Sequence, residues 1–204
     1  MWTKYINRLS VGEEEIHTLY KIVRKSNTKR FFLNRLDQSF RKIEKAYLEF
    51  NRDISKGKSL PKGTDWLLDN FYLVELIYKE LRANIKRERK IVLNTIETGK
   101  YKSYPRVYLL ALELISQGAG SISEENLISF INDFQREDIL SLEEIAQFSR
   151  YITLGLMEWI GNISSSLMKI YTLWQEIDNF DLSIEGNLAK IVENIHSMDS
   201  TQIE

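Results

Sequence analysis

The chain has 204 residues, 43% of them hydrophobic, and it contains no cysteine. This length and composition can form one well-packed core. The lack of cysteine excludes disulfides, zinc–thiolate sites and cysteine nucleophiles. The first residues carry no signal-peptide pattern. No stretch has the roughly 20 consecutive apolar residues of a membrane-spanning helix, so we expect no segment that crosses a bilayer.

The net charge of −1 conceals two halves of opposite charge. Residues 1–102 hold 23 Lys and Arg against 13 Asp and Glu, whereas residues 103–204 hold 5 against 16. The halves could be two solvated surfaces that attract each other weakly. Alternatively, the basic half could face an anionic membrane surface, another domain or nucleic acid. Because no nucleic-acid-binding motif accompanies the basic residues, we expect no nucleic-acid partner.

The first part of the chain is typical of long helices. Residues 12–25 predict a helix with acidic residues in its first turn and basic residues in its last. A second helix is expected over about residues 29–55, because apolar residues recur there at spacings of three and four. A linker with three lysines and two glycines follows at 56–63, and Thr64 or Asp65 is expected to cap a third helix.

Further helices are predicted after this third one, which should loosen near residues 84–89. A short amphipathic piece at 91–96 and a loop at 98–103 precede a helix opened by Pro105. Capping boxes at 121–124 and 141–144 open the next two helices. We expect the later of these to break near Phe148, and a last helix at about 183–196. No convincing strand alternation is present.

These elements together predict an all-α fold. We expect a bundle of about seven to eight helices with a long N-terminal helical arm or hairpin. The predicted organisation is a hairpin or arm at 1–56, a helical core domain at 64–197 and a frayed tail at 198–204.

Catalytic motifs are scarce in the sequence. It has no phosphate-binding glycine loop, and His17 and His196, at opposite ends of the chain, are its only histidines. We therefore expect no metal site and no cofactor. Glycoside hydrolysis by two carboxylates stays open, although acidic residues on helices usually face solvent or pair with a base. The candidate carboxylates are Asp69, Glu75, Glu113 and Glu158.

Two dense segments, 66–72 and 104–108, place aromatic side chains around polar ones. Asp69 has apolar neighbours in its helix, and Arg106 stands at a helix start, where the helix dipole disfavours a cation. We predict that Arg106 bonds Asp69 or a nearby carbonyl and fixes the crossing of two helices. A packing role for this pair is favoured over ligand binding, since buried polar networks commonly specify packing. The possible sugar-contacting residues are Trp66, Asn70, Tyr72, Tyr104, Tyr108 and Trp159.

The same segments resemble the N-terminal region of the cyclic β-1,2-glucan synthases. The resemblance covers about residues 45–165, and its blocks follow in the order and spacing of the family. It is carried by Leu60-Pro61, by residues 66–75 (WLLDNFYLVE), by residues 104–115 (YPRVYLLALELI), more loosely by residues 127–135, and by residues 140–145 (LSLEEI) and 156–160 (LMEWI). The chain departs from the family at residues 84–88, where the family commonly has a proline–glycine turn with aromatics.

The resemblance implies a large bacterial inner-membrane parent enzyme. Such synthases combine a transferase domain that extends β-1,2-glucan from UDP-glucose, a cyclising domain and a phosphorylase-like domain. The resembling region lies upstream of the transferase, and no catalytic residues carry over to it. The resemblance also implies a location on the cytoplasmic side, attached to the inner membrane through the parent protein.

Three functions follow as hypotheses. The first is a non-catalytic accessory domain that docks or positions the catalytic domains of such a glycosyltransferase. The second is a helical domain that holds the nascent β-1,2-glucan through aromatic residues. The third is a free-standing helical protein with a partner in trans. The expected partners are the other domains of the synthase, with β-1,2-glucan and an anionic membrane surface as further candidates.

Overall fold

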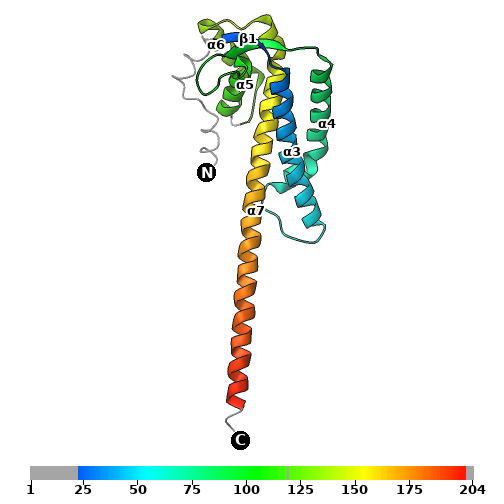
Figure 1. The fold of residues 1–204 in the computed structure, drawn as a ribbon, viewed down its shortest axis with the longest axis vertical. Coiled ribbons are helices and arrows are strands. Elements are labelled where there is room, and N and C mark those ends of the chain that lie inside the picture. The colour runs from blue at the N-terminus through cyan, green and yellow to red at the C-terminus, as the bar shows by residue number, and fades with distance from the viewer. Residues whose placement is uncertain (1–22, 119, 201–204) are drawn as a thin grey trace.

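The computed structural model describes residues 23–118 and 120–200 of the chain. This part is mostly helical, with five α-helices and two short strands (Figure 1). The predicted all-helical class is therefore correct in its main content, but the helices are fewer than the seven to eight expected. The elements are β1 (Val23–Asn27), α3 (Lys29–Ile54), α4 (Thr64–Arg87), β2 (Val92–Ile96), α5 (Arg106–Gln117), α6 (Glu124–Glu137) and α7 (Leu142–Ser200).

Helix α3 forms the centre of the body, with α7 along one side and α4 along the other (Figure 1). The predicted apolar seam of α3 is confirmed as far as Phe50, since Leu36, Ile43 and Phe50 are fully buried, but its last predicted residue, Ile54, is 48% exposed. The close approach of α7 depends on Gly161, because a Cβ at that position would lie 3.0 Å from the backbone oxygen of Ser39. Residues 29–54 are thus part of the core, as their continuous apolar stripe requires.

Helix α4 packs on α3 through stacked aromatic rings. The centroids of Phe40 and Tyr78 lie 3.9 Å apart, and those of Tyr47 and Phe71 lie 3.8 Å apart. The N-cap of α4 is Gly63, with φ +92°, so the prediction of a Thr64 or Asp65 cap was wrong. A left-handed residue ends the linker there, and glycine adopts that conformation without steric cost.

An antiparallel pair of strands lies at one end of the body. β1 and β2 pair in a register that sets Val23 opposite Ile96 and Asn27 opposite Val92. The prediction of no strands was wrong, as was that of a helix reaching residue 25. Each strand has only five residues and pairs with a segment about 70 residues away in the chain, so local periodicity carries little signal of it.

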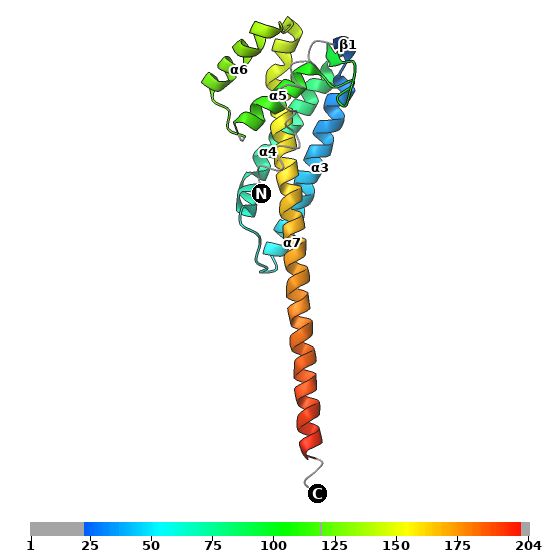
Figure 2. The same ribbon diagram turned by 90° about the vertical axis from the view of Figure 1, so that its left-hand side faces the viewer.

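Helix α5 is the most deeply buried helix of the described part, with nine of its residues buried. It packs against α7 at Gly155, where a Cβ would lie 2.5 Å from Ile115 Cδ1. Helix α6 opens with Ser123 as its N-cap, whose hydroxyl accepts a hydrogen bond from the backbone of Asn126. This end of the body therefore combines the strands, α5 and α6 (Figure 2).

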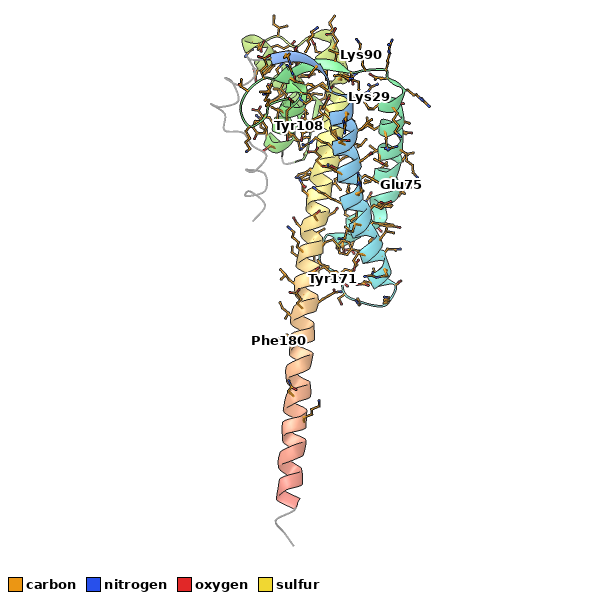
Figure 3. The ribbon with its side chains drawn as sticks, in the orientation of Figure 1. Lys29, Glu75, Lys90, Tyr108, Tyr171 and Phe180 are labelled. Atoms are coloured by element: carbon orange, nitrogen blue, oxygen red, sulfur yellow. The ribbon has the colours of Figure 1, made fainter. Side chains whose placement is uncertain are left out.

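Helix α7 is continuous over 59 residues. The break expected near Phe148 and the separate helix expected at 183–196 were therefore wrong, because no proline interrupts this part of the sequence. Beyond Tyr171 the helix projects from the body as a long arm (Figures 1 and 3). The helix that projects from the body is thus C-terminal to the core, whereas the predicted arm or hairpin was N-terminal. The residues predicted as helix at 12–22 and as tail at 201–204 lie outside the described residues.

Within residues 23–118 and 120–200, no helix has both the length and the apolar composition that a bilayer crossing requires.

Candidate functional site

The candidate site is centred on residues 104–108, where α5 begins. Pro105 adopts an extended conformation (φ −61°, ψ 131°) as the N-cap and forms a bridge with Thr95 of β2. The Ile96 amide donates to the Tyr104 carbonyl at 2.9 Å. Contacts with β2 therefore fix the backbone at the start of α5. This backbone carries the side chains of Tyr104, Arg106 and Tyr108.

Arg106 forms a buried polar cluster with the start of α7. Its guanidinium donates to both carboxylate oxygens of Glu144, at 3.0 and 2.7 Å. It also donates to Asp138 Oδ2 at 2.5 Å and to the Ile139 carbonyl at 3.1 Å. Arg106 is 2% exposed and Glu144 is fully buried. A bidentate arginine–carboxylate pair in this environment constrains orientation strongly, so this cluster locks α5 to the start of α7.

Glu144 also completes the predicted capping box of α7. The Ser141 amide donates to Glu144 Oε2 at 3.0 Å, and the Glu144 amide donates to the Ser141 hydroxyl at 3.3 Å. Asn94 of β2 donates to the same carboxylate at 3.0 Å. One carboxylate thus joins β2, α5 and the N-terminus of α7, and the sequence signal for it was the serine–glutamate spacing of the capping box.

A second cluster joins α3, α5 and α7 around Glu158. Arg35 donates to both oxygens of Glu158, at 2.5 and 3.1 Å, and the Tyr108 hydroxyl donates to it at 2.7 Å. The Arg35 guanidinium also lies 4.7 Å from the centroid of the Tyr108 ring and 5.4 Å from that of Tyr104. Burial and the adjacent Glu158 charge raise the pKa of the Tyr108 hydroxyl far above its usual range, so Tyr108 acts here as a donor.

A third cluster ties α3 to α7 at the base of the arm. The hydroxyl of Tyr171 donates to Asp53 Oδ2 at 2.8 Å, and Lys58 donates to the same oxygen at 3.1 Å. Figure 3 labels Tyr171 at the level where α3 turns toward α4. The hydrogen bond from Tyr171, with those from Lys58 and Arg52, holds the pKa of the Asp53 carboxyl well below its usual range despite its burial.

The hydrogen bonding of these clusters favours a role in fixing the packing of the helices. Both oxygens of Glu144 and of Glu158 are already bonded to protein donors. Among the described residues, every buried side-chain nitrogen or oxygen has a hydrogen-bond partner. A satisfied polar network rigidifies a core and specifies its packing. We therefore interpret the three clusters as structural networks that hold the helices of the body in fixed positions relative to one another.

Of the partners predicted for Arg106, Asp69 was wrong, whereas the alternative of a carbonyl is met by Ile139. Asp69 is exposed on α4, whereas Arg106 is buried among acceptors from the α6–α7 connection and the start of α7. The apolar neighbours of Asp69 that suggested a buried carboxylate, such as Leu67 and Val74, lie on the inward face of α4. At 100° per residue, Asp69 falls on the opposite face.

The remaining carboxylates proposed for hydrolysis lie on three different helices. Glu75 lies on α4 and pairs with Lys79 at 2.8 Å. Glu113 lies on α5, while Glu158 is bonded to Arg35 and Tyr108. The contact of Glu75 is therefore local and those of Glu158 are structural.

The six possible sugar-contacting residues divide into three places. Tyr104 and Tyr108 come together beside Arg35. Trp66 and Tyr72 are 52% and 71% exposed on α4, where the Asn70 side chain donates to the Trp66 carbonyl at 2.8 Å. Trp159 lies on α7 beneath Gly120, where a Cβ would come within 2.4 Å of its ring. The structure brings together only the tyrosine pair and, separately, Trp66 and Asn70. Tyr72 lies six residues further along α4 and points about 120° away from Trp66 around the helix.

Several residues of the clusters were not predicted from the sequence. Arg35 was not singled out from the sequence, yet its guanidinium lies over the rings of Tyr104 and Tyr108. Asp138 and Asn94 had no sequence signal, because their contacts with this site span 32 and 50 residues. Glu144 could have been identified through its capping box.

The fold and the three clusters show that the described part is a helical body from which one long helix projects. Comparison with known proteins adds one similarity. The chain is 23% identical over 133 residues to a cyclic beta-(1,2)-glucan synthase, NdvB of Rhizobium meliloti (strain 1021). The alignment covers 65% of this chain and only 5% of that protein. No family model and no solved structure matches the chain. The similarity supports a distant relationship to one small part of the synthase.

Proposed function

We propose that this chain is a non-catalytic helical accessory domain of a cyclic β-1,2-glucan synthase-like system, and that it docks or positions the catalytic domains. The similarity to a glucan synthase over 133 residues is the observation that carries this proposal. The closed polar clusters agree with it, because they fix helices and leave the carboxylates of Glu144 and Glu158 engaged. On this proposal the protein lies on the cytoplasmic side of the inner membrane, held there by the synthase.

The experiment is an in-frame deletion of the codons for residues 23–200 in the native gene. We expect the amount of β-1,2-glucan extracted from the cells to fall, because the catalytic domains lose the body that positions them. Reintroduction of the intact gene should restore it. Unchanged glucan yield and chain length in the deletion strain would refute the accessory role.

A second candidate function, glucan binding, is favoured by the exposure of Trp66 and Tyr72 on α4. Exposed rings can stack on sugar faces, and both lie on the same helix. Calorimetric titration of β-1,2-glucan into the chain should then give a binding isotherm that Trp66→Ala abolishes. Phe180→Ala, which removes an exposed ring from α7, should leave the isotherm unchanged. Absence of heat at millimolar sugar would exclude this function.

A membrane contact is supported by the basic turn between α4 and β2. Lys86, Arg87, Arg89 and Lys90 are all exposed there, and each basic residue near an anionic surface contributes about 1 kcal/mol to binding. Flotation with phosphatidylserine vesicles should carry the protein at low salt and release it at high salt. Replacement of these four residues by glutamine should abolish flotation, and salt-insensitive flotation would argue against the electrostatic contact.

A further inference from the structure

The arm of α7, residues 172–200, continues an apolar stripe that begins at Ile170, at the edge of the body. Ile170, Trp174 and Ile177 are 40%, 45% and 58% exposed, although residues of this size are usually covered. They recur at spacings of four and three on a helix that continues to Ser200. Figure 3 shows this part of α7 leaving the other helices below Tyr171.

The sequence continues the same spacing along the rest of the helix. The next positions of the stripe are Asp181, Ile184, Leu188, Ile191, Ile195 and Met198. The alternation of three and four is the heptad pattern of a coiled coil, in which apolar positions recur on average every 3.5 residues. The arm supplies four heptads, the length at which such a pattern predicts a coiled coil.

The size of this stripe fits a stable interface between two copies. A fully buried apolar side chain removes roughly 60–120 Å² from water, so eight apolar positions remove roughly 500–1,000 Å² per copy. A standard protein interface buries about 800 Å² on each partner. The arm is about 43 Å long at 1.5 Å per residue, which is enough to present these positions to a second helix.

Charge favours an antiparallel arrangement of the two arms. In a parallel pair, Asp181 of both copies would meet at the same level, and two adjacent carboxylates disfavour each other. An antiparallel pair sets Asp181 beside Ile191 of the other copy, Ile177 beside Ile195 and Trp174 beside Met198. The acidic group then has no like charge opposite it in the seam.

The ends of the arms are also complementary in charge. Residues 172–200 contain six acidic residues and one lysine. The turn between α3 and α4 lies beside α7 at the base of the arm (Figure 1) and carries Lys56, Lys58 and Lys62. Two of the six acidic residues, Glu193 and Asp199, lie at the distal end of the arm. In an antiparallel pair this end approaches the lysine-rich turn of the other copy, where opposite charges favour the pairing.

We propose that the arm of α7 is a self-association surface, and that two copies of this chain pair through it as an antiparallel coiled coil. This association belongs to the chain itself, so it stands or fails independently of the proposed role in glucan synthesis.

Sedimentation equilibrium of the purified full chain tests the association. The expected species has twice the mass of the 24.1 kDa chain. Ile177→Asp places a charge in the seam of both copies and should raise the dissociation constant about 100-fold or more. Thr172→Asp, which adds the same charge to an exposed position off the stripe, should change it little. A monomeric wild type, or a dimer that Ile177→Asp leaves intact, would overturn the proposal.

Disulfide cross-linking tests the orientation, because the native chain has no cysteine. Ile177→Cys and Ile195→Cys should cross-link on oxidation when the two variants are mixed, since antiparallel pairing sets these positions opposite each other. Neither variant should form a cross-linked pair alone. Efficient cross-linking of each variant with itself would show parallel arms and overturn the antiparallel arrangement. Unchanged circular dichroism melting of the variants would confirm that the body is intact.

Discussion

Replacement of Arg106 by methionine is the sharpest perturbation that the structure suggests for the body. Arg106 donates four hydrogen bonds from α5, and three of them go to the carboxylates of Glu144 and Asp138. Methionine keeps much of the apolar volume but removes every donor. Glu144, which is fully buried, would then retain bonds only from Asn94 and the Ser141 amide.

The expected cost follows from the burial of this charge. Removal of one partner of a buried ion pair costs about 3–5 kcal/mol, because the remaining charge is left uncompensated. For a chain of this size, each kcal/mol lowers the melting temperature by about 2–4 °C. The Arg106→Met variant should therefore melt about 6–20 °C below the wild type.

Thermal unfolding followed by circular dichroism measures this difference. Arg136→Met is the matched control, because Arg136 forms an exposed pair with Asp133 and such pairs contribute about 0–1 kcal/mol. Glu144→Gln added to Arg106→Met should recover part of the lost stability, because glutamine removes the unpaired charge and still fits the capping box. The reasoning is refuted if Arg106→Met melts together with Arg136→Met.

Two further predictions concern the other clusters. Tyr108→Phe removes the hydrogen bond to Glu158 and should lower the free energy of unfolding by about 1–3 kcal/mol, because the carboxylate loses a buried donor. Chemical denaturation measures this difference. The control Tyr72→Phe changes an exposed residue and should leave the free energy of unfolding nearly unchanged; equal losses in the two variants would contradict the role of the cluster. Asp53 has a pKa well below its usual range in the folded protein. Its contribution to stability is therefore full above the unfolded pKa of about 3.9, begins to fall below that pH, and is lost completely only as the pH falls through the folded-state pKa. The gap in melting temperature between wild type and Asp53→Asn should therefore shrink between pH 7 and pH 3, and a constant gap would show that Asp53 carries no such linkage.

The sequence predicted those parts of the fold that depend on local periodicity. The apolar seam of α3 and the capping box at Ser141 and Glu144 were both predicted, because spacings of three and four residues encode helix faces and helix starts directly. The segment 104–108 was also identified as a centre of packing, since bulky aromatic residues beside an arginine are unusual at a helix start.

The errors concern contacts between distant parts of the chain. The strands depend on pairing between residues 23–27 and 92–96, and neither segment alternates over a length that a local pattern resolves. Asp69 was named, beside a nearby carbonyl, as a partner of Arg106 because both segments are dense in aromatic residues. Composition does not encode the direction of a side chain, and the rotation of α4 directs Asp69 outward.

The breaks expected near Phe148 and before residue 183 do not occur in α7, and the glycines of this helix lie elsewhere. Gly155 and Gly161 lower the intrinsic helix propensity of this region, yet both are needed where α7 approaches Ile115 and Ser39. Tertiary packing therefore explains why two glycines that lower the local helix propensity occur within α7. The arm beyond Tyr171 has the opposite character, since its sequence is strongly periodic while its described residues extend away from the body.

The central claim is that this chain is an accessory domain of a β-1,2-glucan synthase. It is tested most directly by measuring whether synthase activity co-purifies with the protein. The native gene is tagged, membranes are solubilised in mild detergent, and the tagged protein is purified on an affinity resin. We predict that UDP-glucose-dependent synthesis of β-1,2-glucan elutes with the tag. Activity that remains entirely in the unbound fraction, while the tagged protein is recovered intact, would contradict the account.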